Sequence, residues 1–383
     1  MSSDKKYDYI IAGMGCAGLS LAMQLKRSSL NFSKVLLIDK DLKNKNDRTW
    51  CFWTKEKNNW FDEIVFKRWN KFSFKGDLFE KEITLNPYSY LMIKGIDFYD
   101  FCLNELKNDS RFEILTDEIK EINSKDAFAI LKTKEQTYSC NYLFNSAFRT
   151  LNKKANHINY VQHFKGWLIE TEMDSFNMDC PVFMDFSVKQ HNDCRFIYVI
   201  PFSKTKALIE YTGFSDTGLN DDFYDKELKN YIQNTLNITT YKIIETEKGD
   251  IPMVESDFIN PFGDRVVNIG TAGGSSKPST GYTFYFIQKN TKYIIHQLET
   301  GSSKLVSPKR KKRFLLYDKI LLEVLDKKEI SAKNVFTDLF RKNKIKNLLA
   351  FLNEESSVAQ DLLIMNSVSK KHFIKASLKK LTK

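Results

Sequence analysis

The sequence predicts a mixed α/β (α+β) fold, and three features of its 383 residues lead to this class. Near the N-terminus, an apolar strand, a glycine-rich turn, a helix and a second apolar strand follow one another. Many short β-like runs come next, and a second glycine-rich turn begins among them at Gly270. From about Pro308 onward the apolar residues follow a helical period.

The composition is that of a folded protein with a sizeable core and a basic surface. Hydrophobic residues make up 42% of the chain and aromatic residues 14%, and the formal net charge is +11. A basic balance favours phosphates, nucleic acid or anionic membranes. The chain has no zinc-finger spacing, helix-turn-helix signal or RNA-binding aromatic motif, so we expect no nucleic-acid partner. The six cysteines and five histidines are scattered, which predicts reduced thiols and no metal site.

The first element is an uncharged stretch from Tyr9 to Leu25, which has the composition of a membrane span or a signal peptide. Its internal order indicates something else. Tyr7–Ile11 is an apolar β-like run, and helix-forming apolar residues continue to Leu25. The run KVLLID that follows is typical of a buried parallel strand and ends in Asp39. We therefore interpret the stretch as soluble core rather than membrane.

The turn between this first strand and the helix has the spacing G-x-G-x-x-G at Gly13, Gly15 and Gly18. In a dinucleotide-binding fold, the first glycine allows the tight turn, the second lets the backbone approach the pyrophosphate, and the third lets helix and strand pack closely. The helix N-terminus favours phosphate, and an acid about 20 residues further on, here Asp39, binds the adenosine ribose. The alternative is an α/β domain whose glycine turn is empty. The expected cofactor-binding residues of this part also include Cys16, Ala17 and Lys40.

The segment after Asp39 lacks the regular alternation of strands and helices of an NAD-binding domain. A polar loop leads to a strand that ends near Ile93 and to a helix after it. Four short β-like runs follow, which resemble the antiparallel meander inserted in flavoprotein domains; a generic α+β insertion is the alternative. The runs cover residues 112–115, 118–122, 128–133 and 137–147.

The second glycine-rich turn lies between a strand at Val266–Ile269 and a helix that follows Pro278. A second strand, turn and helix aimed at one cofactor is what an FAD-binding protein needs, with amides that face the phosphates, the ribityl chain and the flavin edge. For this reason we favour FAD over NAD. The expected binding residues here are Gly270, Thr271, Thr280 and Gly281.

Five segments, in order along the chain, closely resemble bacterial FAD-dependent lycopene beta-cyclases. The most specific is GTAGGSSKPSTGYTF at 270–284, and DRTWCFW at 47–53 resembles the Thr-Trp motif after the second strand. VQHFKGWLIET at 161–171 resembles the family's Gln-x-Phe-x-Gly-Trp segment. FMDF at 183–186 and FIYVIPFSKTKALIEYTGFS at 196–215 follow in place.

The resemblance implies the FAD-binding fold of the flavin hydroxylase and geranylgeranyl reductase type, with an inserted antiparallel substrate sheet and a helical C-terminal region. In this division the substrate sheet interrupts the FAD-binding domain. The expected ranges are 1–155 and 252–300 for the FAD-binding domain, 156–251 for the substrate-binding β-sheet region, and 301–383 for the helical region with its basic tail.

The resemblance also implies an isomerase (an intramolecular lyase) of carotenoid biosynthesis. It would cyclise the linear ψ-end groups of lycopene to β-rings, through γ-carotene to β-carotene. The reaction involves no net redox change, yet in this family it depends on reduced FAD, so NAD(P)H is the implied reductant. A related FAD-dependent monooxygenase or isoprenoid reductase is the alternative function, and a non-catalytic flavin or carotenoid carrier is a further one.

Glu210 is the expected catalytic acid. It lies in KALIEYTGF, a β-like run that pairs through the turn SKTK with RFIYVIPF, and it is the only charge between Ala207 and Ser215. Strand alternation places it on one face with Leu208 and Thr212, where the family's Leu/Phe-x-Glu-x-Thr motif maps. An alkene is a very weak base, so its acid must be kept protonated in an apolar pocket; a nearby anionic, reduced flavin favours that state and stabilises the cation. Without the resemblance, a solvated strand glutamate is the default interpretation.

Asp185, in FMDF, is the second carboxylate to consider, with a structural hydrogen-bond acceptor as an equal alternative. The segment from about Tyr160 to Ile251 is expected to form the sheet over the flavin. Its aromatic residues are candidates for a polyene channel, where π faces meet a cation, or for ordinary sheet core. They are Phe183, Phe186, Phe196, Tyr198, Phe202 and Phe214.

The C-terminal part predicts helices and a basic amphipathic tail. After Asp361 there is no acid while lysines are frequent, and Ile374, Leu378 and Leu381 share one helix face. Such a tail suits an anionic membrane surface, where a long hydrocarbon substrate is dissolved; a frayed, solvated tail is the alternative. No segment is a credible membrane span. We therefore expect a cytoplasmic protein that associates peripherally with the inner membrane.

Overall fold

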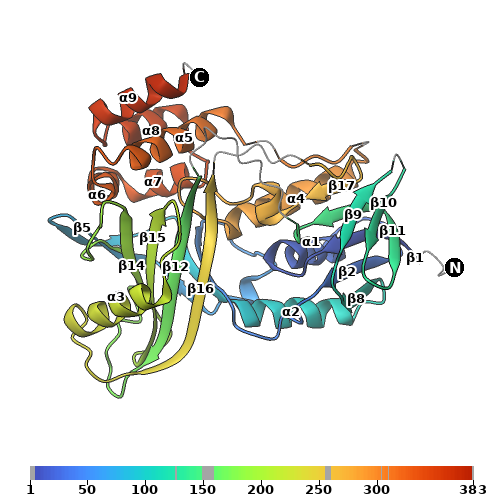
Figure 1. Ribbon diagram of the computed structural model, residues 1–383, viewed down its shortest axis with the longest axis horizontal. Coiled ribbons are helices and arrows are strands. Elements are labelled where there is room, and N and C mark those ends of the chain that lie inside the picture. Colours follow the sequence, from blue (N-terminus) through green and yellow to red (C-terminus); the bar gives the residue numbers. More distant parts are fainter. Residues whose placement is uncertain are drawn as a thin grey trace.

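The computed structural model describes residues 5–125, 127–148, 159–254, 260–302, 304–308 and 310–381. Two seven-stranded sheets and one three-stranded sheet form its framework. In Figure 1 the sheet that begins with β1 lies on the right, the sheet that contains β12 to β16 lies on the left, and the C-terminal helices (red) lie above the left-hand sheet.

The first sheet contains the N-terminal glycine motif and is mostly parallel. Its order is β8-β2-β1-β11-β10-β9, with β17 beside β11. The antiparallel pairs are β9–β10 and β10–β11, which form a three-stranded meander. The expectation of four meander strands is therefore wrong for the run at 112–115: this strand, β8, follows a helix that returns the chain, so it pairs in parallel with β2. The strands are β1 (Lys5–Ala12), β2 (Val35–Asp39), β8 (Phe112–Thr116), β9 (Glu121–Ser124), β10 (Ala129–Lys132), β11 (Thr137–Asn145) and β17 (Val266–Asn268).

Three helices pack on one face of this sheet. Helix α1 (Cys16–Arg27) links β1 to β2, α2 (Gly95–Lys107) precedes β8, and α4 (Phe284–Glu299) follows β17. Their apolar side chains share one core with strand residues such as Leu37 and Phe144. The predicted order of strand, glycine turn and helix is thus confirmed at both glycine motifs.

The second large sheet has the order β16-β12-β15-β14-β13-β5-β6, and its neighbours are antiparallel except for β13 and β5. The hairpin predicted around the turn SKTK is confirmed as β14 and β15. Strands β5 and β6 come from a part of the chain far before the range 156–251, so this sheet joins two distant segments. The strands are β5 (Lys71–Gly76), β6 (Phe79–Thr84), β12 (Asn159–Glu170), β13 (Val182–Asp185), β14 (Cys194–Pro201), β15 (Lys206–Ser215) and β16 (Lys242–Val254).

A small antiparallel sheet is formed by three strands that occur between β2 and β8 in the chain. Its order is β3-β7-β4, with β3 (Thr49–Thr54), β4 (Lys67–Trp69) and β7 (Ser89–Lys94); the 3-10 turn η1 (Asp62–Ile64) precedes β4. Strand β3 carries part of the DRTWCFW segment, and residues 49–51 line the cavity described below.

The two faces of the second large sheet have different partners. One face, which includes Ile209, packs against α3 (Asp221–Asn234). The other face includes Phe214, which contacts Phe336 of a C-terminal helix. Because side chains alternate along a strand, Glu210 belongs to this second face.

Helices form the whole described C-terminal part, as the sequence predicted. Helices α6 and α7 are separate, because the helical geometry of α6 ends at Asn343, whose backbone is extended. No helix in the described residues is long and apolar enough to cross a membrane. The helices are α5 (Lys312–Lys327), α6 (Ala332–Lys342), α7 (Ile345–Leu352), α8 (Val358–Met365) and α9 (Lys370–Leu381).

Candidate active site

A cavity of about 660 Å³ lies where the two glycine turns meet the second large sheet. The first glycine turn, β3, the loop before α4, and strands β12, β14, β15 and β16 all contribute to its wall. Every expected site residue except Gly18 lines this cavity. They are Gly13, Gly15, Cys16, Ala17, Asp39, Lys40, Glu210, Gly270, Thr271, Thr280 and Gly281.

Gly13 and Gly18 shape the turn between β1 and α1. Gly13 has a φ of +102°, which side chains rarely allow, and an added Cβ would lie 2.4 Å from Ser146 Oγ. A Cβ on Gly18 would lie 1.9 Å from the carbonyl oxygen of Gly13 and 3.0 Å from Ile11 Cγ2. Gly18 therefore lets α1 pack closely against β1, which explains why it lies outside the cavity wall.

The N-terminus of α1 opens into the cavity. A Cβ built on Gly15, the residue before the helix, meets no atom within 4 Å, so the backbone there is accessible to a ligand. Cys16 and Ala17 begin the helix beside it. Burial raises the pKa of the Cys16 thiol, so the thiol stays neutral and leaves the positive end of the helix dipole to an anionic ligand.

Asp39 ends β2 and holds the first glycine turn in place. The Met14 N–H donates a hydrogen bond of 2.7 Å to Asp39 Oδ2, and Lys43 Nζ lies 3.5 Å from the same oxygen. Asp39, Lys40 and Lys43 all line the cavity. A carboxylate suited to ribose hydroxyl groups and two ammonium groups suited to phosphates therefore occur together.

The second glycine motif forms a compact loop between β17 and α4. It begins with the 3-10 turn η2 (Gly270–Gly273), and Gly270 and Gly281 have φ values of +61° and +69°. Within the loop, the Lys277 N–H donates to the Tyr282 carbonyl at 2.9 Å and the Gly281 N–H donates to the Lys277 carbonyl at 2.8 Å. These bonds fix the backbone beside the cavity.

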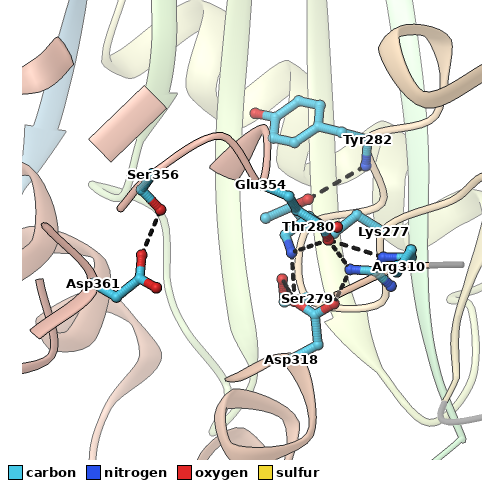
Figure 2. A network of polar contacts seen from close by, with 9 residues as sticks. All are labelled: Lys277, Ser279, Thr280, Tyr282, Arg310, Asp318, Glu354, Ser356 and Asp361. Atoms are coloured by element: carbon cyan, nitrogen blue, oxygen red, sulfur yellow. Dashed lines mark hydrogen bonds and ion pairs between the residues drawn. The ribbon is translucent and has the colours of Figure 1, made fainter. Parts of the chain in front are cut away.

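A buried network of charges ties this loop to the C-terminal helices (Figure 2). Lys277 Nζ donates to Asp318 Oδ1 at 2.7 Å and to Glu354 Oε1 at 3.1 Å, and Ser279 Oγ donates to Asp318 Oδ1 at 2.6 Å. Arg310 contacts both carboxylates. Burial alone would raise the pKa of Asp318, but the charges of Lys277 and Arg310 outweigh it and lower this pKa. The carboxylate therefore stays ionised and holds the loop against α5.

An unpaired oxygen of Gln162, on β12, indicates that the cavity suits a ligand with polar groups. The Gln162 side chain is 8% exposed and lines the cavity, yet Oε1 has no hydrogen-bond partner among the described residues. Leaving such an oxygen unpaired costs about 1–3 kcal/mol, so a ligand that brings an N–H or O–H group fits here. Together with two open glycine turns and a helix N-terminus, this acceptor fits a large dinucleotide such as FAD.

Four positions on adjacent strands form one row that faces the cavity. Tyr198 of β14 pairs with Glu210 of β15, Glu210 pairs with Gly166 of β12, and Gly166 pairs with Glu247 of β16. Directly paired residues lie on the same face of a sheet. Tyr198, Glu210 and Glu247 line the cavity, and because Gly166 has no side chain, nothing in the row separates the two glutamates.

Glu210 lies on the face that the sequence predicted, and Leu208 lines the cavity beside it. Thr212 Oγ1 donates a hydrogen bond of 2.8 Å to Glu210 Oε1. Burial raises the pKa of Glu210 above its ordinary value, and this effect outweighs the hydrogen bond from Thr212 and the charge of Arg48. A raised pKa favours the protonated carboxyl group, which is the form that can act as an acid.

Glu247 is a buried carboxylate beside Glu210 in the cavity, and sequence reasoning missed it. It is 9% exposed, and Thr49 Oγ1 donates a hydrogen bond of 2.9 Å to its Oε2. Its side chain lies beside that of Glu210 across Gly166, because a Cβ on this glycine would be 3.3 Å from Glu247 Cγ and 3.4 Å from Glu210 Cβ. Burial, followed by the negative charge of Glu210, raises the pKa of Glu247 well above its ordinary value. The available signal was the family's Gln-x-Phe-x-Gly-Trp segment, whose glycine is Gly166.

Asp185 has the structural role that was the alternative interpretation. It accepts hydrogen bonds from the Tyr231 hydroxyl at 2.8 Å and from the Ser187 N–H at 2.7 Å. It is buried on β13 and is not among the described residues that line the cavity. Both carboxylate oxygens are therefore satisfied within the protein.

Most of the six aromatic candidates form sheet core. Tyr198 lines the cavity, and Phe202 lines a small neighbouring cavity that shares Leu208 and Glu247 with it. The other four are buried in a cluster that includes the side chains of α6, so the C-terminal helices fill the space over this part of the sheet. They are Phe183, Phe186, Phe196 and Phe214.

Two glycine turns around one cavity, with an antiparallel sheet over it, define an FAD-binding flavoprotein fold, and solved structures agree. A flavoprotein/dehydrogenase from Cytophaga hutchinsonii superposes with a TM-score of 0.61 at 11% identity, over 95% of this chain and 100% of that one. The halogenase PltM, solved with phloroglucinol and FAD, superposes with a TM-score of 0.62 at 12% identity, over 98% and 93%. A geranylgeranyl bacteriochlorophyll reductase-like protein from Thermoplasma acidophilum gives 0.57 at 12% identity, over 99% of both chains.

Sequence comparison then places the chain within this class. The chain belongs to the lycopene cyclase family, because the family model for lycopene cyclase protein matches residues 8–380. A lycopene beta-cyclase from Paracoccus sp. (strain N81106 / MBIC 01143) is 25% identical over 289 residues, 72% of this chain and 70% of that protein. One from Pantoea ananas is 22% identical over 287 residues, 72% and 71% of the two chains. The family resemblance predicted from the five segments is confirmed.

Proposed function

We propose that this protein cyclises the ψ-end groups of lycopene to β-rings, through γ-carotene to β-carotene, with Glu210 as the acid. The observation that carries the proposal is the position of Glu210. A carboxyl group with a raised pKa lies in the cavity that both glycine turns line, in a chain of the lycopene cyclase family.

The chemistry at the end group is a proton transfer followed by ring closure. The O–H bond of the protonated Glu210 breaks as a C–H bond forms at the terminal double bond. The neighbouring alkene attacks the resulting cation, and loss of a proton completes the β-ring. Tyr198 and Tyr282 line the cavity, and their rings favour a cation and exclude the water that would capture it.

The glycine turns, with Asp39, Lys40, Thr271 and Thr280, would hold FAD through its phosphates, ribose and flavin edge. When bound in its reduced form, FAD supplies a fixed negative charge, which favours protonated Glu210 and stabilises the cation without net electron transfer. NAD(P)H is the proposed reductant.

The proposed division of the chain has three parts. Residues 1–155 and 252–300 form the FAD-binding domain, residues 156–251 form the substrate region, and residues 301–383 form the helical region. Strands β5 and β6 join the sheet of the substrate region.

Peripheral association with the cytoplasmic face of the inner membrane is also part of the proposal. Helix α9 packs on α5 through an inner face that includes Ala376, while Ile374 is 57% exposed and Leu378 61% exposed. Lys375 Nζ lies 2.5 Å from Glu329, which anchors the helix. An anchored helix with an apolar outer face and basic flanks suits an anionic membrane that contains the substrate.

The test is pigment analysis after expression of the chain in cells that accumulate lycopene. We expect conversion to β-carotene, or to γ-carotene if one end is processed. Unchanged lycopene in cells that contain folded, FAD-loaded protein contradicts the proposal. In that case, stoichiometric NAD(P)H consumption with a substrate would indicate a monooxygenase or isoprenoid reductase, and its absence would indicate a carrier.

A further inference from the structure

We propose that Glu210 and Glu247 act as one proton-sharing carboxyl pair, in which Glu247 is a positioning residue that holds and returns the proton of Glu210. The proposal rests on the proposed function for its substrate and on sheet geometry for the pair itself. It assigns a role to a buried carboxylate that the acid mechanism leaves unused.

The gap at Gly166 makes the pair possible. Glu210 and Glu247 lie on either side of β12, so their Cα atoms are separated by two strand spacings, about 10 Å. Two glutamate side chains span this distance only if the strand between them carries no side chain. A Cβ on Gly166 would lie 3.3 Å from Glu247 Cγ and 3.4 Å from Glu210 Cβ, and 2.9 Å from Leu208 Cδ1.

The closeness of the two carboxyl groups across Gly166 favours a proton shared between them. Two carboxylates repel each other, so a hydrogen bond between two carboxyl groups requires one of them to be protonated. Thr212 donates to Glu210 and Thr49 donates to Glu247, which leaves each glutamate another oxygen for its partner. One shared proton therefore satisfies both groups.

The other ionisable groups close to the pair do not take part in its proton exchange. Arg48 is the charged residue that acts on both glutamates, and it stabilises their anionic forms. Burial raises the pKa of each neighbouring thiol and phenol, so these groups stay neutral. They are Cys51, Tyr90, Tyr198 and Tyr282.

The pair closes the proton balance of the reaction without an added base. At the start it holds one proton and one negative charge. When Glu210 protonates the alkene, the pair is left with two negative charges beside the cation, which stabilises the cation and makes the pair a strong base. Attack by the neighbouring alkene forms the ring C–C bond and moves the positive charge onto the ring. A C–H bond next to that charge then breaks to give the ring double bond, and its proton returns to the pair. No electron is gained or lost.

The first test is infrared spectroscopy of the folded protein without substrate, titrated with pH. We expect a protonated-carboxyl band that persists to neutral pH in the wild type and that both Glu210→Gln and Glu247→Gln shift or remove. Glu245→Gln is the matched control, because Glu245 is exposed on the same strand. Unchanged bands in Glu247→Gln, or a band that responds to Glu210→Gln alone, would overturn the pair.

The second test is the pH profile of ring formation. The last proton of a coupled carboxyl pair is lost at a higher pH than the proton of a single carboxyl group. In Glu247→Gln the pair is absent, so the alkaline limb moves to lower pH and the rate falls at least about tenfold there. Gly166→Ala, which separates the carboxyl groups, should give the same shift. The double variant Glu210→Gln/Glu247→Gln should be no worse than Glu210→Gln alone. An unmoved limb contradicts the proposal. A positive infrared titration without any lycopene conversion retains the pair and refutes the proposed function.

Discussion

Glu210 and Glu247 owe their chemistry to their surroundings, because the same side chains in water would be ionised and inert toward an alkene. Burial disfavours the charged form of each, and the charge of Glu210 further disfavours that of Glu247. The threonine hydroxyls at Thr49 and Thr212 fix the orientation of both carboxyl groups. This environment thus favours the protonated carboxyl group, from which a proton can pass to the weakly basic alkene.

This environment predicts how stability depends on pH. The pKa values of both glutamates are raised above the ordinary 4.5, so the folded protein retains protons that the unfolded chain releases. Stability from these groups is complete below pH 4.5 and is lost as the pH rises through the folded pKa values. We expect the free energy of unfolding to fall less steeply with rising pH in Glu247→Gln than in the wild type. Urea unfolding across this range measures it, and equal slopes would contradict the expectation.

At this scale the sequence, through its resemblance to the lycopene cyclase family, could direct attention to Glu210 but not to Glu247. Glu210 is the single charge in an apolar strand, and alternation assigns its face from local information alone. Glu247 becomes relevant only because β12 lies between β15 and β16 in a register that aligns Gly166 with both glutamates. Such a register depends on pairing between strands that are distant in the sequence.

Between elements, the loop of the second glycine motif depends on helices from the C-terminal part. Lys277 lies in this loop, Asp318 on α5 and Glu354 just after α7, and all three are nearly fully buried. Truncating the lysine would leave two buried carboxylates with a single cation. The cofactor loop and the C-terminal helices should therefore lose their order together.

We expect Lys277→Met to destabilise the protein by about 3–5 kcal/mol, because it breaks a buried ion network. Its FAD content after purification should fall as well. Lys304→Met is the control: Lys304 is 58% exposed in its ion pair with Asp264, so a change of at most about 1 kcal/mol is expected. Denaturant unfolding of both variants measures the difference. Equal stabilities of the two variants would show that the network does not hold the loop.

Alanine substitutions at Gly18 and Gly15, in the first glycine motif, should have different effects. A Cβ at Gly18 collides with the backbone of Gly13, so Gly18→Ala should lower the stability of the FAD-free protein by about 1–3 kcal/mol. A Cβ at Gly15 meets no protein atom but lies at the cavity wall, so Gly15→Ala should keep that stability and weaken FAD binding. Thermal unfolding without FAD, with an FAD titration, separates the two. A Gly15→Ala variant that binds FAD as the wild type does would contradict the backbone contact.

The sequence predicted elements well where the signal is local. Both strand–turn–helix units and the β14–β15 hairpin follow from apolar runs bounded by turn residues. The sequence did not reveal that β8 extends the parallel sheet, or that β5 and β6 join the second sheet. The run that forms β8 was predicted as a strand, whereas β5 and β6 were not predicted. The partners of all three strands are set by the packing of the whole chain.

At the scale of the whole molecule, the cavity lies where the two glycine turns meet the second large sheet. The apolar outer face of α9 is the side that we propose meets the membrane. We expect Ile374→Glu/Leu378→Glu to weaken binding to anionic lipid vesicles more than tenfold, since each buried side chain of this kind contributes about 1.5–3 kcal/mol. Leu78→Glu is the control, because Leu78 is 99% exposed in the β5–β6 turn, far from α9 in the sequence. Vesicle flotation measures binding, and equal flotation of the two variants would refute a role for α9.

Loading with FAD should stabilise the molecule as a whole, because both glycine turns and the second sheet line one cavity. At a free FAD concentration about 100 times its dissociation constant, the expected gain is about 2.7 kcal/mol in the free energy of unfolding. Thermal unfolding with and without FAD measures it. An unchanged unfolding temperature at saturating FAD would contradict the assignment of the cavity.

The central claim is that Glu210 starts the cyclisation, and the most direct measurement compares the pigments made by the wild type and by Glu210→Gln in lycopene-accumulating cells. Both proteins are first checked for equal folding and FAD content. The account predicts β-ring products from the wild type and a loss of at least about 100-fold in the variant, the usual effect of removing a general acid. Undiminished ring formation by a folded, FAD-loaded Glu210→Gln protein would show that another group supplies the proton.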